Sequence, residues 1–307
     1  MSGTDPTKPV RWQGDLAAYY ANPGIDYSRL KLLSTDYPGG GPESYHKYAT
    51  GKWPPLRPNL SMRIGSALDE ILFPRPNDGP PAIDTDSAIL EPAAAMAQSA
   101  RRNPFIADLL ECPGIVQQPY TWVDDASGLD LKAMPDKIIP PGHRWERRHQ
   151  PFAFVVELKS ARDPRPAQFA SDAGRLLYHL QLAFYVDLVS RLFDCQVFPL
   201  WIVVGNRPPH IAWTPYPKDD WLDLGRRLLA RLLWELKHRL TTGDWSNQKP
   251  SPGRAAKTTR RPAGYWKEPK PIGLPTPWSL RKAATTEGRT ILDVARMFYP
   301  GGGRTAD

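Results

Sequence analysis

The alternation of apolar and polar side chains is clearest in residues 152–159, which read FAFVVELK. This stretch is rich in aromatic and β-branched residues, a composition that favours a buried strand over a helix. Side chains alternate along a strand, so Glu157 and Lys159 are expected on one face and Leu158 on the other. A carboxylate and an ammonium group therefore stand side by side at the end of an apolar strand.

A second strand is predicted just before the first in the chain. Residues 129–139, LDLKAMPDKII, also have the character of a strand. The connection, residues 140–151, is rich in proline, glycine and charged residues, which suits a hairpin. If the two strands are neighbours, Asp136 lies within reach of Glu157.

Further elements follow from helical spacing of apolar residues and from turn signals. We expect helices over residues 59–73, 87–110, 169–192 and 221–240, a hairpin of residues 115–123 and 129–139 that reverses at Gly128, and a buried strand over residues 196–204. Short helices are expected near the start, and residues 38–58 are expected to be a connection or a loop that contacts nucleic acid. These elements predict an α/β fold of the α+β type, with a mixed central β-sheet flanked by helices and a helical N-terminal part.

Composition limits the class of protein. The chain has 307 residues and a hydrophobic fraction of 41%, enough for one large domain with a proper core. It contains neither an apolar run of about 18 residues nor a basic segment followed by an apolar one, so we expect no membrane span, no signal peptide and a cytoplasmic location. Only Cys112 and Cys195 are present, too few for a disulfide framework or a four-cysteine iron–sulfur cluster.

The positive charge is concentrated at the C-terminal end. The formal net charge is +8, and residues 249–307 hold 12 lysines and arginines against 4 acidic residues, whereas residues 1–248 hold 28 of each sign. We therefore expect a folded domain over residues 1–248 and a basic, proline-rich tail over residues 249–307 with a short helix. The tail is either a solubilising end or a segment that contacts DNA or an acidic partner.

The two predicted strands bring together residues that suit metal-assisted hydrolysis. Two carboxylates, from Asp136 and Glu157, make with water and phosphate a hard, all-oxygen site that suits Mg²⁺ or Mn²⁺ and not zinc. Lys159 would orient or deprotonate an attacking water, or stabilise the charge that develops on phosphorus. The alternative is an ion pair on the surface of a strand, because Glu-x-Lys alone occurs in many proteins.

The order MPDKII, a short loop, FVVELKS and then YHLQLAFY resembles the PD-(D/E)XK nuclease superfamily. The pattern is most similar to the phage-type recombination exonucleases of the exodeoxyribonuclease VIII kind, over most of residues 17–245. This resemblance implies the superfamily fold and catalytic roles for Asp136, Glu157 and Lys159. It also implies that Gln181 and Tyr185, four residues apart on one helix face, lie over the active site.

The resemblance implies a reaction and partners as well. It implies a Mg²⁺-dependent deoxyribonuclease, with Mn²⁺ able to substitute, that trims linear double-stranded DNA from its ends and leaves a 3′ single strand for recombination. A ring-like homo-oligomer and a partner that anneals single strands are implied too. The setting would be a bacterial cell or a phage-infected host.

The metal site departs from the family pattern at one position. In the resembled family a helical segment, G-S/T-A-x-H, supplies a histidine beside the metal, and here that position is Asp69. Asp69 is then an oxygen ligand in place of nitrogen, or a solvated helix residue at a site that has lost a ligand. The expected metal ligands are Asp136, Glu157, Leu158, which can offer only a main-chain carbonyl, and Asp69.

The loop after Asp136 carries Arg144, Arg147 and Arg148, which are placed to hold DNA phosphates or simply to solvate the loop. Two other functions remain open. One is an endonuclease of a defence or repair system, since related sites cut internal bonds. The other is a DNA-binding protein on a catalytically degenerate nuclease fold, which the departure at Asp69 suggests.

Overall fold

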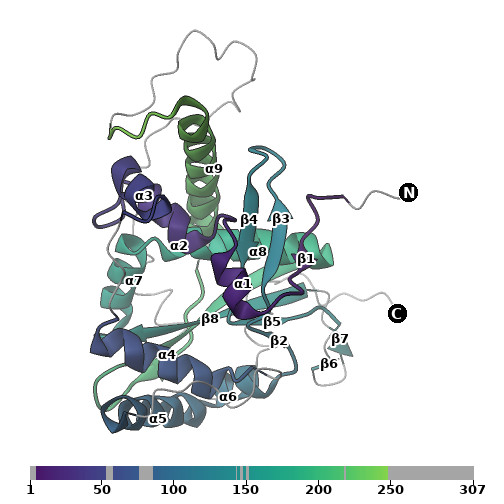
Figure 1. Ribbon diagram of the computed structural model, residues 1–307. Helices are drawn as coiled ribbons and strands as arrows, with labels where there is room; N and C mark the ends of the chain where they lie inside the picture. The colour runs from purple at the N-terminus through teal and green to yellow at the C-terminus, as the bar shows by residue number, and fades with distance from the viewer. Residues whose placement is uncertain are drawn as a thin grey trace.

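A mixed β-sheet lies between two layers of helices (Figure 1). The computed structural model describes residues 5–52, 58–75, 86–142, 144–145, 148–149, 152–217 and 219–247. Within these ranges the central sheet has the strand order β10 (Ala212–Trp213), β9 (Gln196–Gly205), β8 (Phe152–Ala161), β5 (Lys137–Ile139), β2 (Ile115–Val116). The predicted mixed sheet flanked by helices is thereby confirmed.

The two central strands are the longest and run parallel to one another. Their register extends from Phe152 opposite Gln196 to Ala161 opposite Gly205, and the other neighbouring pairs of the sheet are antiparallel. The crossover between β8 and β9 passes through α7 (Pro166–Arg175) and α8 (Tyr178–Phe193). Parallel strands need such a long connection, whereas antiparallel neighbours do not.

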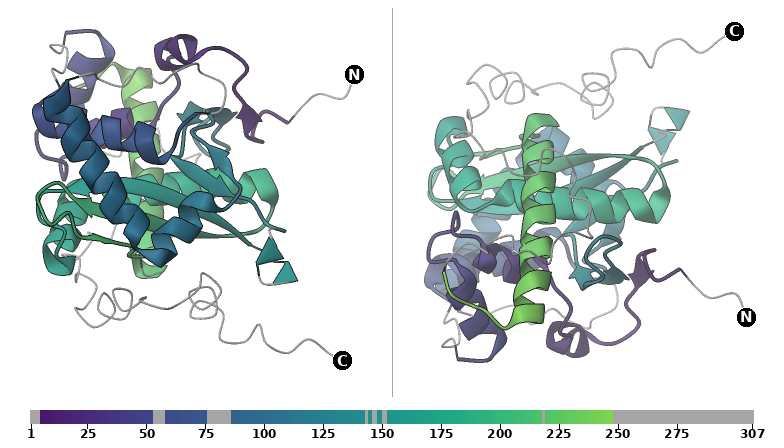
Figure 2. Two further views of the ribbon diagram at one scale, coloured as in Figure 1. Left: turned by 90° about the horizontal axis from the view of Figure 1, so that it is seen from below. Right: turned by 90° about the horizontal axis from the view of Figure 1, so that it is seen from above.

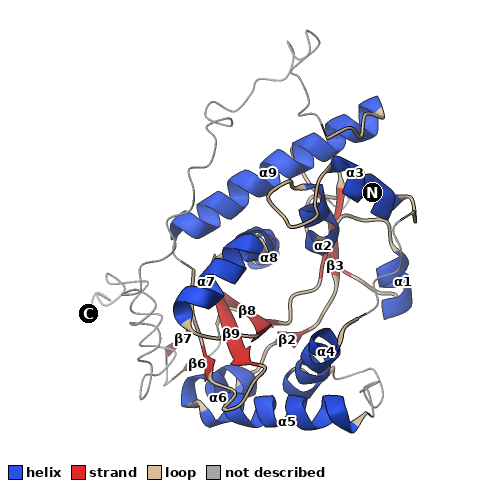
Figure 3. Ribbon diagram, turned by 90° about the vertical axis from the view of Figure 1, so that its left-hand side faces the viewer, coloured by secondary structure: helices blue, strands red, loops and turns tan. Residues whose placement is uncertain are grey.

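The helices form one layer on each face of the sheet (Figure 3). One layer consists of α4 (Leu60–Leu72), α5 (Ser87–Arg102) and α6 (Pro104–Glu111), and the other of α7, α8 and α9 (Asp219–Thr242). Figure 2 shows α9 lying across the outside of α8, which separates it from the sheet. The sheet is therefore buried on both faces.

Two hydrophobic cores lie one on each face of the sheet, and they confirm the alternation predicted for residues 152–159. Phe154, Val156 and Leu158 pack in the core below α4 and α5, whereas Val155 packs in the core below α8. Glu157 shares the α8 side with Val155, because side chains two residues apart lie on the same face of a strand. The side chain of Glu157 therefore lies between the sheet and α8.

The predicted hairpin is divided between two sheets. A smaller sheet has the order β1 (Val10–Arg11), β3 (Tyr120–Val123), β4 (Asp130–Ala133), with the turn at Gly128, where φ is +67°. β2 and β5 pair with each other in the central sheet instead. Pro135 lies between β4 and β5 and has no N–H for a ladder, so the strand is interrupted directly before Asp136.

Two predicted long helices are each broken in the structure. The helix expected over residues 87–110 is α5 followed by α6, because Asn103 ends the first and its side chain accepts hydrogen bonds from the first N–H groups of the second. The helix expected over residues 169–192 is α7 and α8, and Leu177 between them has a left-handed φ of 57°. The predictions failed at these points because apolar spacing continues across both breaks.

The N-terminal part is helical, as predicted, with α1 (Leu16–Ala21), α2 (Tyr27–Leu30) and α3 (Pro42–Ala49). The last of these lies in the stretch expected to be a loop. Its Tyr45 is buried and stacks on Trp245 at 5.6 Å, so this ring packs internally and is not presented to nucleic acid. Trp245 lies just beyond α9, so the contact fixes the N-terminal part against the end of the folded domain.

Several predictions fall partly or wholly outside the described residues. Arg147 is outside them, and of Arg144 and Arg148 only the backbone is described, in the short strands β6 (Arg144–Trp145) and β7 (Arg148–His149). The basic tail over residues 249–307 is outside them as well. Among the helices that are described, none is long and apolar enough to cross a membrane.

Candidate active site

The two predicted carboxylates meet across the β5–β8 junction through a reciprocal pair of hydrogen bonds. The backbone N–H of Asp136 donates to Oε1 of Glu157 at 3.1 Å, and the backbone N–H of Leu158 donates to Oδ2 of Asp136 at 2.7 Å. The register explains this, because Lys137 lies opposite Val156 and the preceding residue therefore faces Glu157. Each carboxylate is held by the backbone of the other strand.

Lys159 lies beside Glu157, two residues further along β8. Its Nζ is 3.2 Å from Oε2 of Glu157, and 13% of its side chain is exposed. The ammonium also lies over the ring of Tyr178, 5.1 Å from the ring centroid. The lysine is therefore fixed by a carboxylate on one side and an aromatic face on the other.

Gln181 and Tyr185, from the first two turns of α8, lie next to Glu157. Nε2 of Gln181 donates to Oε2 of Glu157 at 2.9 Å and lies 3.5 Å from the hydroxyl oxygen of Tyr185. Gln181 is 8% exposed and Tyr185 is 9% exposed, so both are held inside the protein. The structure brings both predicted residues next to Glu157, and Gln181 holds the Glu157 carboxylate by a hydrogen bond.

Asp69 reaches the same region from α4. Gly65, one turn earlier, lies against β8 so closely that a Cβ there would be 3.2 Å from Oγ of Ser160. Residues four apart share a helix face, so the close approach at Gly65 brings Asp69 toward the strands as well. Oδ2 of Asp69 accepts a hydrogen bond of 2.6 Å from Nε2 of Gln117.

Gln117 is a site residue that the sequence did not reveal. It is buried, has a left-handed φ of 44°, and its backbone N–H donates to the carbonyl oxygen of Asp136 at 3.0 Å. Its side-chain oxygen accepts from Nε of Arg75. Gln117 thereby connects Asp69 to the strand end that carries Asp136, and a glutamine in a polar QQP sequence gives no signal of this role.

Lys31 is a second residue that sequence reasoning missed. Its Nζ lies 5.0 Å from the ring centroids of both Tyr27 and Tyr37. Burial, followed by repulsion from Lys159, lowers the pKa of Lys31 below its ordinary value. Lys31 therefore lies beside two tyrosine rings, and its charge interacts with that of Lys159.

The electrostatics of the site are dominated by burial. Burial raises the pKa of Glu157 to about 8, with a further contribution from Asp136, and Lys159 opposes the shift. Burial also raises the pKa of Asp136. Burial disfavours the charged form of Lys159, but attraction to Glu157 and Asp136 outweighs it and the pKa of the lysine is raised. The carboxylates therefore have more negative charge than one lysine balances.

The pKa of Asp69 is raised as well. Burial raises the pKa of Asp69 to about 8, and repulsion from Asp136 and then Glu70 adds to the shift. Its Oδ1 is a buried acceptor without a hydrogen-bond partner among the described residues. A buried acceptor with no donor, beside carboxylates that repel it, is a position where a cation would be stabilising.

A divalent ion of the hard class fits these residues. Within the described ranges no three His, Cys, Asp or Glu side chains lie close enough together to hold a metal ion among them. Mg²⁺ does not need three such side chains, because it is commonly bound by one or two carboxylates and completes its shell with water and phosphate oxygens. Asp136 and Glu157 supply such a pair, and the orphaned Oδ1 of Asp69 is the third oxygen available from a side chain.

Comparisons with known proteins support the fold alone. No family model matches the chain, and no curated protein matches it. A crystal structure of a protein from Eubacterium rectale, described as a "putative exonuclease", is similar with a TM-score of 0.57 and 16% sequence identity, over 85% of this chain and 96% of that chain. The chain therefore has the mixed α/β fold of that protein over nearly the whole length of the latter.

Proposed function

We propose that this chain is a metal-dependent nuclease that hydrolyses phosphodiester bonds of DNA. The observation that carries the proposal is the reciprocal pair of backbone hydrogen bonds that holds Asp136 and Glu157 together, with Lys159 3.2 Å from the latter. The order of these residues resembles the PD-(D/E)XK motif, and the similarity in fold to a protein described as a "putative exonuclease" is consistent with it. The proposed cofactor is Mg²⁺, with Mn²⁺ able to replace it.

Each residue has a proposed part in the reaction. Asp136 and Glu157, with the main-chain carbonyl of Leu158 and with Asp69, would hold the metal ion. When bound, that ion lowers the pKa of a coordinated water and neutralises charge on the phosphate. Lys159 would hold the attacking water or the phosphate oxygens through its ammonium hydrogens. Gln181 keeps Glu157 in place through their hydrogen bond of 2.9 Å.

The finer proposal is an exonuclease acting on the ends of linear duplex DNA and leaving a 3′ single strand for recombination. It rests on the resemblance to exonucleases of the exodeoxyribonuclease VIII kind and on the exonuclease description of the structural neighbour. Proposed partners are DNA ends, a protein that anneals single strands, and further copies of this chain. Arg144, Arg147 and Arg148 are proposed to contact DNA phosphates, in a cytoplasmic setting.

Digestion of end-labelled duplex DNA tests both levels of the proposal. Linear duplex labelled at the 5′ end of one strand, the same duplex labelled at the 3′ end, and a covalently closed circle are each incubated with Mg²⁺, Mn²⁺ or EDTA. A nuclease gives product only with metal. An exonuclease spares the circle, an endonuclease opens it, and the label released first as a mononucleotide identifies the end that is attacked.

A second candidate function, a DNA-binding protein without catalysis, is favoured by one observation. Asp69 occupies the position where the resembled family has a histidine, and a hydrogen bond of 2.6 Å from Gln117 engages one of its oxygens. If the chain is a DNA-binding protein without catalysis, it should bind DNA tightly and give no cleavage product at any concentration of Mg²⁺ or Mn²⁺. The digestion described above separates the two.

Without a divalent cation, the stability of the protein is expected to fall as the pH rises toward 8. The pKa values of Asp69 and Glu157 are raised from 3.8 and 4.5 to about 8, so between these limits the folded state binds more protons than the unfolded state. Stability is therefore lost as pH rises through this window. Mg²⁺ should offset the loss, because it stabilises the ionised carboxylates of the folded state.

Thermal unfolding with EDTA and with excess Mg²⁺, at pH 5 and pH 8, measures this effect. The gain in Tm from Mg²⁺ is expected to be larger at pH 8, and for a domain of this size each kcal/mol corresponds to about 2–4 °C. Glu157→Gln removes one titrating group and should flatten the pH dependence in EDTA. A gain that is equal at both pH values would contradict a metal site built on these carboxylates.

A further inference from the structure

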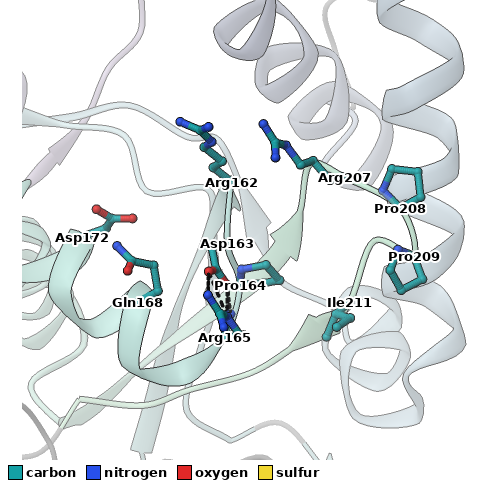
Figure 4. A pocket seen from close by; sticks show the side chains of 10 residues that line it. All are labelled: Arg162, Asp163, Pro164, Arg165, Gln168, Asp172, Arg207, Pro208, Pro209 and Ile211. Carbon is teal, nitrogen blue, oxygen red and sulfur yellow. Dashed lines mark hydrogen bonds and ion pairs between the residues drawn. The ribbon is translucent and has the colours of Figure 1, made fainter.

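A pocket of about 520 Å³ opens at the ends of the two parallel strands, next to the start of α7 (Figure 4). Arg162 follows the last residue of β8, and Arg207 follows β9 after one intervening residue. Both are exposed, and Figure 4 shows their side chains extending to the same side of the pocket. The apolar part of the lining consists of Pro164, Pro208, Pro209 and Ile211.

The walls of this pocket are fixed by hydrogen bonds that join its segments. The backbone N–H of Asn206 donates to the carbonyl oxygen of Ala161 at 2.9 Å, which continues the ladder past the last strand pair. The indole N–H of Trp213 donates to the carbonyl oxygen of Pro164 at 2.8 Å. Gly205 has no side chain, and a Cβ there would lie 3.0 Å from Cγ of Pro164. The pocket is therefore built into the sheet.

The charge of the lining is positive and only partly balanced. Asp163 is bonded to Arg165, and Asp172 is bonded to Arg175 at 3.1 Å. Among the residues that the structure describes, neither Arg162 nor Arg207 has an acidic partner within ion-pair distance. Both lining carboxylates are thus already paired, and two guanidinium groups remain available for an anion.

The pocket lies on the same strand as the candidate active site. Arg162 is three residues beyond Lys159, and at about 3.3 Å per residue of strand this is roughly 10 Å. One strand of DNA rises by only about 3.4 Å per nucleotide along the duplex axis, so a strand that passes Lys159 has further phosphates within this span. A nucleic-acid strand held at Lys159 can therefore reach the pocket.

We propose that this pocket binds one nucleotide of the DNA strand that occupies the active site, close to the scissile bond. Arg162 and Arg207 hold its phosphate, because a guanidinium group matches phosphate oxygens with two parallel donors. The prolines and Ile211 pack against the sugar and base without selecting a sequence, since their surface offers no hydrogen-bonding groups. The proposal rests on the proposed nuclease function and adds a specific subsite for the substrate strand.

The test measures DNA binding separately from cleavage. Arg162→Ala, Arg207→Ala and the double variant are compared with Arg227→Ala, an exposed arginine on α9 that gives the same change in charge. All are made in the Lys159→Ala background, and binding of a fluorescein-labelled linear duplex with a single-stranded end is followed by anisotropy at several salt concentrations. Cleavage is measured in the same set with Lys159 intact.

Each single substitution in the pocket is expected to weaken DNA binding about tenfold. Each should also lower the slope of log affinity against log salt concentration (the salt slope) by about 1, and the double variant should lower this slope by about 2. Arg207→Lys should keep most of the salt slope, because the charge remains. In cleavage, KM should rise more than kcat falls. Affinities and slopes equal to those of Arg227→Ala would overturn the subsite.

The outcome also distinguishes this subsite from the nuclease proposal. Metal-dependent cleavage by the parent chain, with no effect of the arginine substitutions on binding, rejects the pocket and keeps the nuclease. No cleavage with any metal, with binding still weakened at Arg162 and Arg207, keeps a DNA-phosphate pocket and rejects the nuclease. The thermal stability of each variant is measured alongside, and because both arginines are exposed it should stay at the parent value.

Discussion

Replacing Lys159 by alanine is expected to lower the rate of DNA cleavage by about a thousandfold or more, which corresponds to about 4 kcal/mol of activation free energy. Asp136→Ala and Glu157→Ala are expected to have effects of the same size. Each of these substitutions removes one proposed metal-binding carboxylate, while the backbone N–H that holds the other carboxylate stays in place. Lys159 is 3.2 Å from Glu157, and its charge also acts on Asp136.

Rates are measured on linear duplex DNA under single-turnover conditions, with Mg²⁺ well above the parent's requirement. Lys237→Ala, an exposed lysine on α9, is the matched control and should cleave like the parent. Thermal unfolding shows whether each variant is folded. If Lys159→Ala is folded and cleaves at nearly the parent rate, the assignment of the site is wrong.

The part of the site on β8 could be predicted because a strand has a simple geometry. The sequence FVVELK places Glu157 and Lys159 on one face by alternation alone, and the 3.2 Å contact between them agrees with this. Asp136 needed one more step, the pairing of two strands, and the register that brings it to Glu157 depends only on neighbouring elements. Local rules were sufficient for these three residues.

The remaining contacts depend on packing between distant segments, which one sequence does not display. Gln117 meets Asp69 across 48 positions of sequence, and its left-handed backbone conformation has no glycine to signal it. Leu177 likewise breaks the predicted helix at a left-handed position, and burial of its side chain in the core is what makes that conformation tolerable. The apolar pattern that predicted the helix was correct on both sides of the break.

The position of α4 shows how packing determines chemistry. Gly65 lets this helix lie against β8 near Ser160, where a Cβ would be in tight contact, 3.2 Å from Oγ of Ser160. Asp69 is one turn further along the same helix face. Burial, followed by repulsion from Asp136, raises the pKa of Asp69, so its chemistry depends on how closely α4 packs on the strands.

If Asp69 is a metal ligand as proposed, Asp69→Ala is expected to raise the Mg²⁺ concentration needed for half-maximal cleavage by about tenfold or more, because one of three proposed carboxylate ligands is lost. Its Oδ1 has no hydrogen-bond partner among the described residues, whereas Oδ2 is held by Gln117. Oδ1 of Asp69 is thus the oxygen that would coordinate a metal ion. Asp69→His should retain cleavage with greater reliance on Mn²⁺, since nitrogen ligation suits the transition metal better.

Metal titrations of cleavage on one linear duplex, with Mg²⁺ and with Mn²⁺, compare the parent with Asp69→Ala and Asp69→His. Glu91→Ala is the matched control, because it removes an exposed carboxylate from the neighbouring helix α5 and should leave both titrations unchanged. Asp69→Asn keeps the shape of the side chain and loses its charge, so it separates ligation from packing against Gln117. If it titrates like Asp69→Ala, the charge is what binds the metal. Titration curves of all three Asp69 variants that superimpose on the parent's would remove Asp69 from the site and leave Asp136 and Glu157 as the only carboxylates proposed to bind the metal.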